Sequence, residues 1–224
     1  AYFASRPGRE VVLTGSSRMK QRPIRILVEA LRGLGADIDY LETPGCPPLR
    51  IRGRALKGSR VSLPADVSSQ YISALLLVAP SLENGLEITL EGRITSLPYI
   101  RMTLGLLERV GIPSRFQGQT LWVGHIPAVK TPLDCTVESD WSSASYYFSL
   151  LALAPAGSRM GLRAYRKDSL QGDSVLPRIY DAMGVCTSFD GDRMVLEQGG
   201  SPATDFLELN LIRTPDLAQT IAVS

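Results

Sequence analysis

The feature that most constrains the fold of this chain is a long segment that occurs more than once. Leu63–Pro80 (LPADVSSQYISALLLVAP) passes from a polar start to a continuous apolar run, and 133–155 does the same. Its Ser142-Ser143 pair lies 74 positions after Ser68-Ser69, and Thr214-Pro215-Asp216 begins a third copy 74 positions after Asp140. Solenoid repeats have periods of roughly 20 to 50 residues. The longer period predicts a whole supersecondary unit repeated within a domain.

A second kind of helix recurs with nearly the same spacing. Its three copies end at Gly35, Gly111 and Gly184, which are 76 and 73 positions apart. Glycine suits the left-handed conformation that commonly follows the last residue of a helix. We therefore expect helices from about Pro23 to Leu34, from Pro98 to Val110, and from residue 171 to Met183.

Short apolar or alternating runs between these helices predict strands. The expected strands are residues 10–14, 37–41, 49–53, 60–63, 87–90, 114–116, 120–123, 135–138, 160–163 and 207–211, with a hairpin around 190–192. Each repeat then has the order β-α-β-α-β-β. This alternation predicts an α/β protein with α+β layering, in which both strand directions are present.

The stretch 125–133 contains two prolines and has little periodicity, which is typical of a linker. We therefore predict two domains, residues 1–132 and residues 133–224. The chain begins without Met, and it stops inside an apolar stretch. From this we expect a fragment that is truncated at both ends.

The polar starts of the repeated helices are candidate binding sites. Asp66 and Asp140 are expected to cap their helices, and the apolar run that follows Asp66 predicts a helix buried nearly all round. Hydroxyls, an amide and unpaired backbone N–H groups meet at Ser68-Ser69-Gln70. Such a helix start can hold an anionic or hydroxylated ligand. The alternative is that the serines only cap the helix.

Four cations crowd the start of the helix that follows Pro23. They are Arg18, Lys20, Arg22 and Arg25. Cations have the wrong sign for this end of a helix, where an anion is favoured by about 0.3–1 kcal/mol. One interpretation is a bound dianion between the cations and the helix start, and the alternative is a solvated basic loop.

Composition excludes several classes of function. A formal net charge of +2 over 224 residues favours neither a nucleic-acid nor a membrane partner. The longest apolar runs are shorter than the roughly 20 residues that span a bilayer. One His and three scattered Cys without a CxxC pair make a zinc site improbable.

Seven segments, in order, resemble the 5-enolpyruvylshikimate-3-phosphate synthase family of enolpyruvyl transferases. They are LTGSSRMKQRPI, PPLRIRG, LPADVSSQY, SLPY, VESDWSSASYY, SLQGD and RTPDLAQT. The resemblance implies two domains, each built of three β-α-β-α-β-β units around a pseudo-threefold axis. It implies transfer of the enolpyruvyl group of phosphoenolpyruvate to the 5-hydroxyl of shikimate 3-phosphate, with release of phosphate, in chorismate and aromatic amino-acid biosynthesis. No cofactor or metal is implied.

The resemblance also assigns roles residue by residue. It places shikimate 3-phosphate on Ser68, Ser69, Gln70, Ser96, Tyr99 and Asp216. It places phosphoenolpyruvate on Arg22 and Gln70. Asp216 looks like the carboxylate that accepts the 5-hydroxyl proton, and it is the one catalytic residue expected here. Leu97 departs from the Lys that family members often carry.

Further family residues would lie outside the chain. A Lys, an Arg and a GTAMR-like loop would precede Ala1, and an acid–base Glu, two Arg and a Lys would follow Ser224. We therefore expect that the fragment does not turn over alone. We expect the parent protein to be a cytoplasmic monomer without nucleic-acid or membrane partners.

Two alternatives are considered. The first is a UDP-N-acetylglucosamine enolpyruvyl transferase, which uses a loop Cys. None of Cys46, Cys135 and Cys186 lies in such a motif, and SSQY followed by SLPY favours the shikimate branch. The second is a non-catalytic module that holds shikimate 3-phosphate without reacting.

Overall fold

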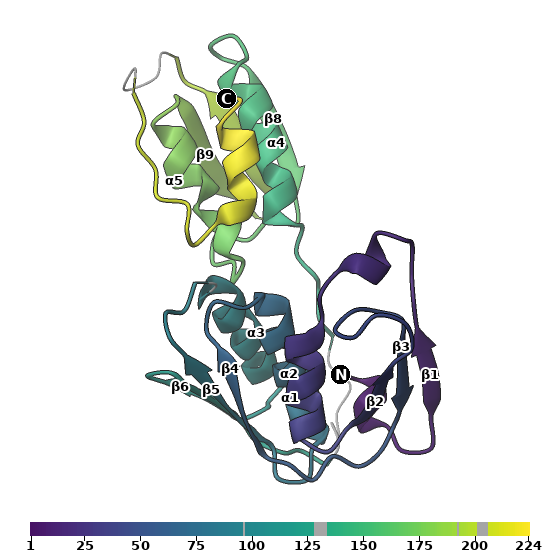
Figure 1. Cartoon of the computed structure of the whole chain (residues 1–224). Helices are drawn as coiled ribbons and strands as arrows, with labels where there is room; N and C mark the ends of the chain where they lie inside the picture. Colours follow the sequence, from purple (N-terminus) through teal and green to yellow (C-terminus); the bar gives the residue numbers. More distant parts are fainter. Residues whose placement is uncertain (96, 128–133, 192, 201–205) are drawn as a thin grey trace. The chain divides into compact units, whose positions relative to one another are not determined.

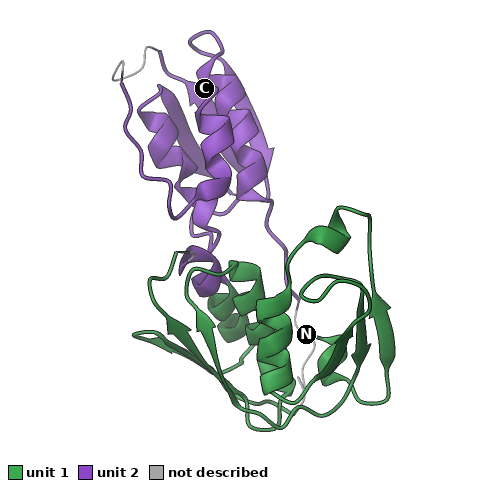
Figure 2. Ribbon diagram, in the orientation of Figure 1, with its two compact units in different colours: residues 1–96, 103–133 green, residues 97–102, 134–224 purple. Residues whose placement is uncertain are grey.

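The computed structural model of the chain describes residues 1–95, 97–127, 134–191, 193–200 and 206–224. The chain divides into two compact units (Figure 2). Unit 1 comprises residues 1–96 and 103–133, and unit 2 comprises residues 97–102 and 134–224. Among the described helices, none combines the length and apolarity needed to cross a membrane.

The first sheet of unit 1 has three antiparallel strands in the order β1-β3-β2. Its elements are η1 (Phe3–Ser5), β1 (Glu10–Leu13), η2 (Met19–Gln21), α1 (Arg25–Gly33), β2 (Asp37–Tyr40) and β3 (Leu49–Arg52). Leu27, Val28 and Leu31 lie on one face of α1 and are buried, as helical spacing requires. Helix α1 contacts β4 as well as β2, so it links the two sheets of unit 1 (Figure 1).

The second sheet of unit 1 has the order β4-β5-β7-β6. Strands β4 and β5 are parallel, and the other two pairs are antiparallel. Its elements are β4 (Arg60–Pro64), α2 (Ser69–Val78), η3 (Ala79–Ser81), β5 (Leu86–Glu91), α3 (Leu97–Arg109), β6 (Ser114–Gln117) and β7 (Thr120–Val123). The start of α3, residues 97–102, belongs to unit 2.

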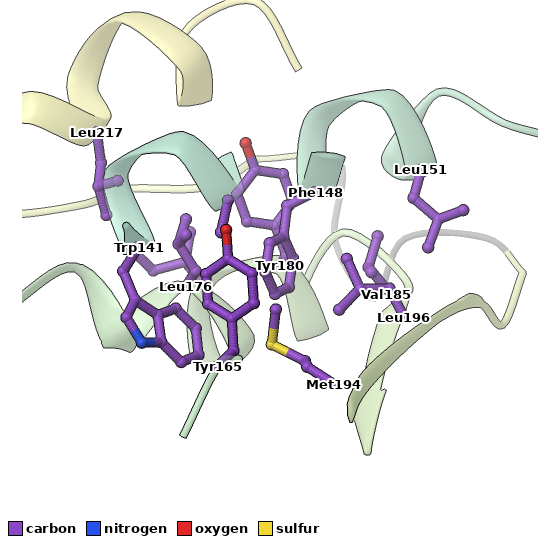
Figure 3. Close-up of a cluster of buried hydrophobic side chains, with 12 residues drawn as sticks. Trp141, Phe148, Leu151, Tyr165, Leu176, Tyr180, Val185, Met194, Leu196 and Leu217 are labelled. Atoms are coloured by element: carbon purple, nitrogen blue, oxygen red, sulfur yellow. The ribbon is translucent and has the colours of Figure 1, made fainter. Parts of the chain in front are cut away.

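Unit 2 has a three-stranded antiparallel sheet in the order β8-β10-β9. Its elements are α4 (Trp141–Ala152), β8 (Arg159–Arg163), η4 (Gly172–Val175), α5 (Leu176–Asp181), β9 (Val185–Asp190), β10 (Arg193–Gln198), η5 (Pro215–Leu217) and α6 (Ala218–Ile221). Helix α4 packs against α5, α6, β9 and β10. Its Trp141, Phe148 and Leu151 enter the core with Tyr180 and Met194 (Figure 3).

The repeat predicted from the sequence is confirmed. The orders β1-β3-β2, β5-β7-β6 and β8-β10-β9 are the same arrangement three times, each with a helix between its first two strands in the sequence. Gly35, Gly111 and Gly184 follow their helices with φ of 102°, 78° and 82°. These positive φ values suit glycine, as expected from the sequence.

Two predicted strands, 135–138 and 207–211, are wrong. Neither range is a strand in the described part of the chain. Directly after the first range, Ser139 N donates one backbone hydrogen bond to Ala164 O at 2.7 Å. In the second, the Asn210 side chain accepts from Ile212 N at 3.2 Å. Such a local bond competes with a strand ladder. The predicted hairpin exists as β9-β10, although Asp192 lies outside the described residues.

The starts and ends of the repeated helices also differ from expectation. Asp66 does not cap α2, because the helix begins later and Ser68 occupies the N-cap without a side-chain cap bond. Ala65 N instead donates to Glu91 O at 2.8 Å, and the chain turns at Ala65-Asp66 before α2 begins at Ser69. Helix α2 is not buried all round, since Leu77 is 60% exposed. The last helix is a 3-10 turn followed by the four residues of α6.

We predict that Ala164→Gly stabilises unit 2. Ala164 has a φ of 60°, the left-handed region in which a Cβ costs about 1–2 kcal/mol. Part of this gain is lost to the greater freedom of glycine in the unfolded chain, so we expect a net increase of about 0.5–1 kcal/mol in the free energy of unfolding. Urea unfolding measures it.

The matched control is Ala144→Gly, at a buried position inside α4. There glycine is less favourable than alanine by about 1 kcal/mol, so this variant should be less stable. A loss of stability in Ala164→Gly as large as in the control would contradict the prediction.

Candidate active site

The first pair of site residues lies in unit 2. The Tyr99 hydroxyl, in the first turn of α3, donates to Asp216 Oδ2 at 2.8 Å. Asp216 lies in η5, so the contact joins residues 117 positions apart. A close approach at Gly172 supports this arrangement, because a Cβ there would lie 2.8 Å from Pro98 Cβ. Two of the residues predicted from the sequence are therefore brought together.

Asp140 caps α4, as the sequence predicted. It accepts hydrogen bonds from Ser142 N at 3.1 Å and from Ser143 N at 3.3 Å. The Ser143 hydroxyl donates to it as well, at 2.6 Å. These bonds, the Ser143 hydroxyl first, hold the pKa of Asp140 below its ordinary value. Asp140 therefore stays ionised, and the cap accounts for it completely.

Asp173 is a member of this cluster that sequence reasoning missed. It lies in η4 and is only 3% exposed. The Ser142 hydroxyl donates to its Oδ2 at 2.6 Å, whereas Oδ1 has no hydrogen-bond partner in the described part of the chain. Burial raises the pKa of Asp173, and the charges of Asp216 and Asp140 raise it further. The available signal was its place in SLQGD, one of the seven family-like segments.

The negative charges of this cluster affect the pKa of Tyr99. Burial raises the pKa of Tyr99, as do its hydrogen bond to Asp216 and the negative charges of Asp173, Asp216 and Asp140. The phenol therefore remains a protonated donor at neutral pH. Among the described residues, no hydrogen bond to the other oxygen of Asp216 is found, and a carboxylate in such a position can accept the proton of a ligand hydroxyl.

The remaining predicted residues that the structure describes lie in unit 1. Arg22 directly follows η2, and Ser68, Ser69 and Gln70 form the start of α2. The Tyr71 hydroxyl donates to Pro23 O at 2.6 Å, which ties the first turn of α2 to the segment after Arg22. Within the described residues, no hydrogen bond joins the four side chains to one another. Ser96 lies outside the described residues.

The cation cluster at the start of α1 is partly neutralised by the protein itself. Lys20 Nζ lies 2.7 Å from Glu42 Oε1. Arg25 Nη2 donates to Pro44 O at 3.3 Å. Among the described residues, Arg18 and Arg22 form no ion pair. Arg22 is exposed, so its guanidinium is available to bind a carboxylate or phosphate with two hydrogen bonds.

One full β-α-β-α-β-β unit, β4 to β7, with related partial units before and after it and with polar helix starts, defines a protein of repeated α/β architecture. The family model of EPSP synthase (3-phosphoshikimate 1-carboxyvinyltransferase) matches residues 1–224. The chain therefore belongs to the EPSP synthase family.

Curated relatives and solved structures agree with this family. The 3-phosphoshikimate 1-carboxyvinyltransferase of Bacteroides fragilis (strain YCH46) is 44% identical over 225 residues, covering 100% of this chain and 54% of that protein. That of Actinobacillus pleuropneumoniae serotype 5b (strain L20) is 39% identical, covering 96% and 49%. The EPSP synthase structure from Acinetobacter baumannii has the same fold, with a TM-score of 0.68 at 22% identity, covering 96% and 48%. The chain thus spans about half the length of these relatives.

We predict that Asp173→Asn raises stability at neutral pH. Burial raises the pKa of the Asp173 carboxyl group in the folded protein above its ordinary value of 3.8. The free energy of unfolding therefore falls as the pH rises from 3.8 through the higher pKa of the folded state. Asparagine is neutral and its carbonyl can still accept from Ser142. The variant should be more stable by about 1 kcal/mol at pH 7, since it removes a buried charge and still leaves one buried polar group without a partner.

Urea unfolding at pH 7 and at pH values below 3.8 measures this difference, which should shrink at the lower values. Asp181→Asn, at an exposed position of α5, is the control and should change little. An equal loss of stability for Asp173→Asn at every pH would show instead that the carboxylate stabilises the fold.

Proposed function

We propose that this chain carries about half of the active site of a 3-phosphoshikimate 1-carboxyvinyltransferase. The observation that carries the proposal is the match of the EPSP synthase family model over all 224 residues. The names of the relatives support the shikimate branch rather than transfer to UDP-N-acetylglucosamine. The substrates would be phosphoenolpyruvate and shikimate 3-phosphate.

The proposed roles of the residues follow the family resemblance. Ser68, Ser69, Gln70, Ser96, Tyr99 and Asp216 would hold shikimate 3-phosphate, and Arg22 and Gln70 would hold phosphoenolpyruvate. The hydrogen bond between Tyr99 and Asp216 supports placing these two residues in one site. The exposed guanidinium of Arg22 supports its role with a dianionic ligand.

The proposed chemistry is addition followed by elimination. Asp216 accepts the proton of the 5-hydroxyl as its oxygen attacks C2 of phosphoenolpyruvate, and a proton is added to the methylene carbon. The resulting ketal phosphate then loses a methyl proton and inorganic phosphate, which restores the enol double bond. The acid that protonates the methylene carbon would come from the family's Glu, outside this sequence.

We also propose the arrangement of the whole protein. Residues 1–132 would belong to one domain and residues 133–224 to a second. The protein would act as a cytoplasmic monomer without a cofactor. The near-neutral net charge of +2 agrees with small-molecule substrates and gives no reason for a nucleic-acid partner.

A chimera tests the catalytic role of Asp216. This chain replaces the matching 54% of the Bacteroides fragilis enzyme, and phosphate release is followed with both substrates. We expect the chimera to turn over, and Asp216→Ala to lower kcat by about 10²–10⁴, because a positioned general base is lost. Asp181→Ala serves as the control. An unchanged kcat in Asp216→Ala would remove Asp216 from the mechanism.

The same chimera tests Arg22. Arg22→Lys keeps the charge and removes the planar fork that binds an anion with two hydrogen bonds. We expect KM for phosphoenolpyruvate to rise about tenfold or more, and KM for shikimate 3-phosphate to change much less. Arg109→Lys, at an exposed position near the end of α3, is the matched control. Equal increases in both KM values would mean that Arg22 acts structurally.

A further inference from the structure

We propose that unit 2 contains a second small-molecule site, which takes a free α-amino acid with an apolar side chain. A cavity of about 540 Å³ lies beside the turn that follows β8. Its lining includes Thr136, Glu138, Tyr165, Arg166, Lys167 and Phe189. None of the residues assigned above to substrate binding or catalysis lines it, so the inference does not depend on the proposed function.

Glu138 provides the first argument for a ligand. Its Oε2 atom is buried and has no hydrogen-bond partner in the part of the chain that the structure describes. A buried carboxylate oxygen without a donor is costly, because it has lost water and gained nothing in exchange. Glu138 also lines the cavity and forms no ion pair with another described residue. An ammonium group in the cavity would therefore bring the opposite charge beside this carboxylate.

Two cations at the same cavity provide the second argument. Arg166 and Lys167 are exposed and line the cavity, and neither forms an ion pair with another described residue. Asp168 also lines it, so the described part of the lining carries two cations and two anions. A lining with no net charge discriminates against a simple anion or cation. It matches a molecule that carries one ammonium and one carboxylate.

The apolar part of the lining explains why a side chain would bind as well. Tyr165 is buried, and its ring packs edge-on against Trp141 with 5.2 Å between centroids (Figure 3). Phe189 packs against the same core from β9. Two aromatic walls fixed by the core can cover an apolar side chain. The cavity is also within the usual size range of small-molecule sites, about 300–1,000 Å³.

The cavity wall is connected to the start of α4. The Tyr165 hydroxyl donates to Asp140 O at 3.2 Å. Ser139 N donates to Ala164 O, and Ala164 also lines the cavity. A ligand held here would therefore bind next to the residue that caps α4.

Isothermal titration of the chain with three related probes tests the proposal. L-Phenylalanine has both charged groups, phenethylamine lacks the carboxylate, and hydrocinnamate lacks the ammonium. We expect L-phenylalanine to bind, and each of the other two to bind about ten- to a hundredfold more weakly, the loss expected for one charge-assisted bond. Equal binding of all three, or no binding of L-phenylalanine and L-leucine, would overturn the proposal.

Variants then assign the two charged groups. Glu138→Gln should lower the affinity for L-phenylalanine to the affinity that the unchanged chain has for hydrocinnamate. Arg166→Gln combined with Lys167→Gln should lower this affinity to the affinity that the unchanged chain has for phenethylamine. Arg178→Gln, at an exposed position of α5 outside the cavity, should leave the affinity unchanged. An equal loss in the Arg178 control would contradict the assignment. If Glu138→Gln fails to fold, the titrations of the unchanged chain with the three probes still test the proposal.

Discussion

One backbone hydrogen bond, found at the corresponding place in both units, positions the rest of the site. Ala65 N donates to Glu91 O in unit 1, and Ser139 N donates to Ala164 O in unit 2. In each repeat this bond fixes the end of one extended segment to the end of the next, just before a helix begins. The helix starts are therefore held at one end of each sheet. Such an end collects backbone N–H groups and short polar side chains, which is where an anionic ligand is best accommodated.

In unit 2, one carboxylate near these helix starts is buried and only partly hydrogen-bonded. Asp140 is fully used as a cap, but Asp173 is buried with one oxygen unpartnered and with two further carboxylates nearby. Burial raises the pKa of this carboxyl group. Groups with perturbed pKa values that are not needed for stability are typical of functional sites. Unit 1 contributes a different chemistry, with hydroxyls, an amide and the guanidinium of Arg22.

The sequence predicted the features that depend on local chemistry. The 74-residue period, the three glycines with positive φ and the cap at Asp140 follow from spacing and from single residue types, and all are present. Apart from the strand 207–211, where a local hydrogen bond within the segment competes with a ladder, the failed predictions depended on partners far away in the sequence. Residues 135–138 have strand-like composition but no ladder partner in the described chain, and Asp66 lost the cap because Ala65 was already held by Glu91.

The candidate site was predictable to a similar extent. Tyr99 and Asp216 were both named from family-like segments, and the structure joins them. Asp173 was missed because an aspartate after glycine at a helix start is also an ordinary N-terminal residue. Its burial, which distinguishes it, depends on the packing of η4 against Pro98 and is invisible in the sequence.

The most direct test of the account is an NMR titration of this chain with shikimate 3-phosphate. If these residues form the site, the backbone amide signals of Ser68, Ser69 and Gln70, and those of Tyr99 and Asp216, shift as the ligand is added. Arg109 and Asp181 serve as internal references that should not move. Signals that stay in place at all five residues, while the chain remains folded, would contradict it.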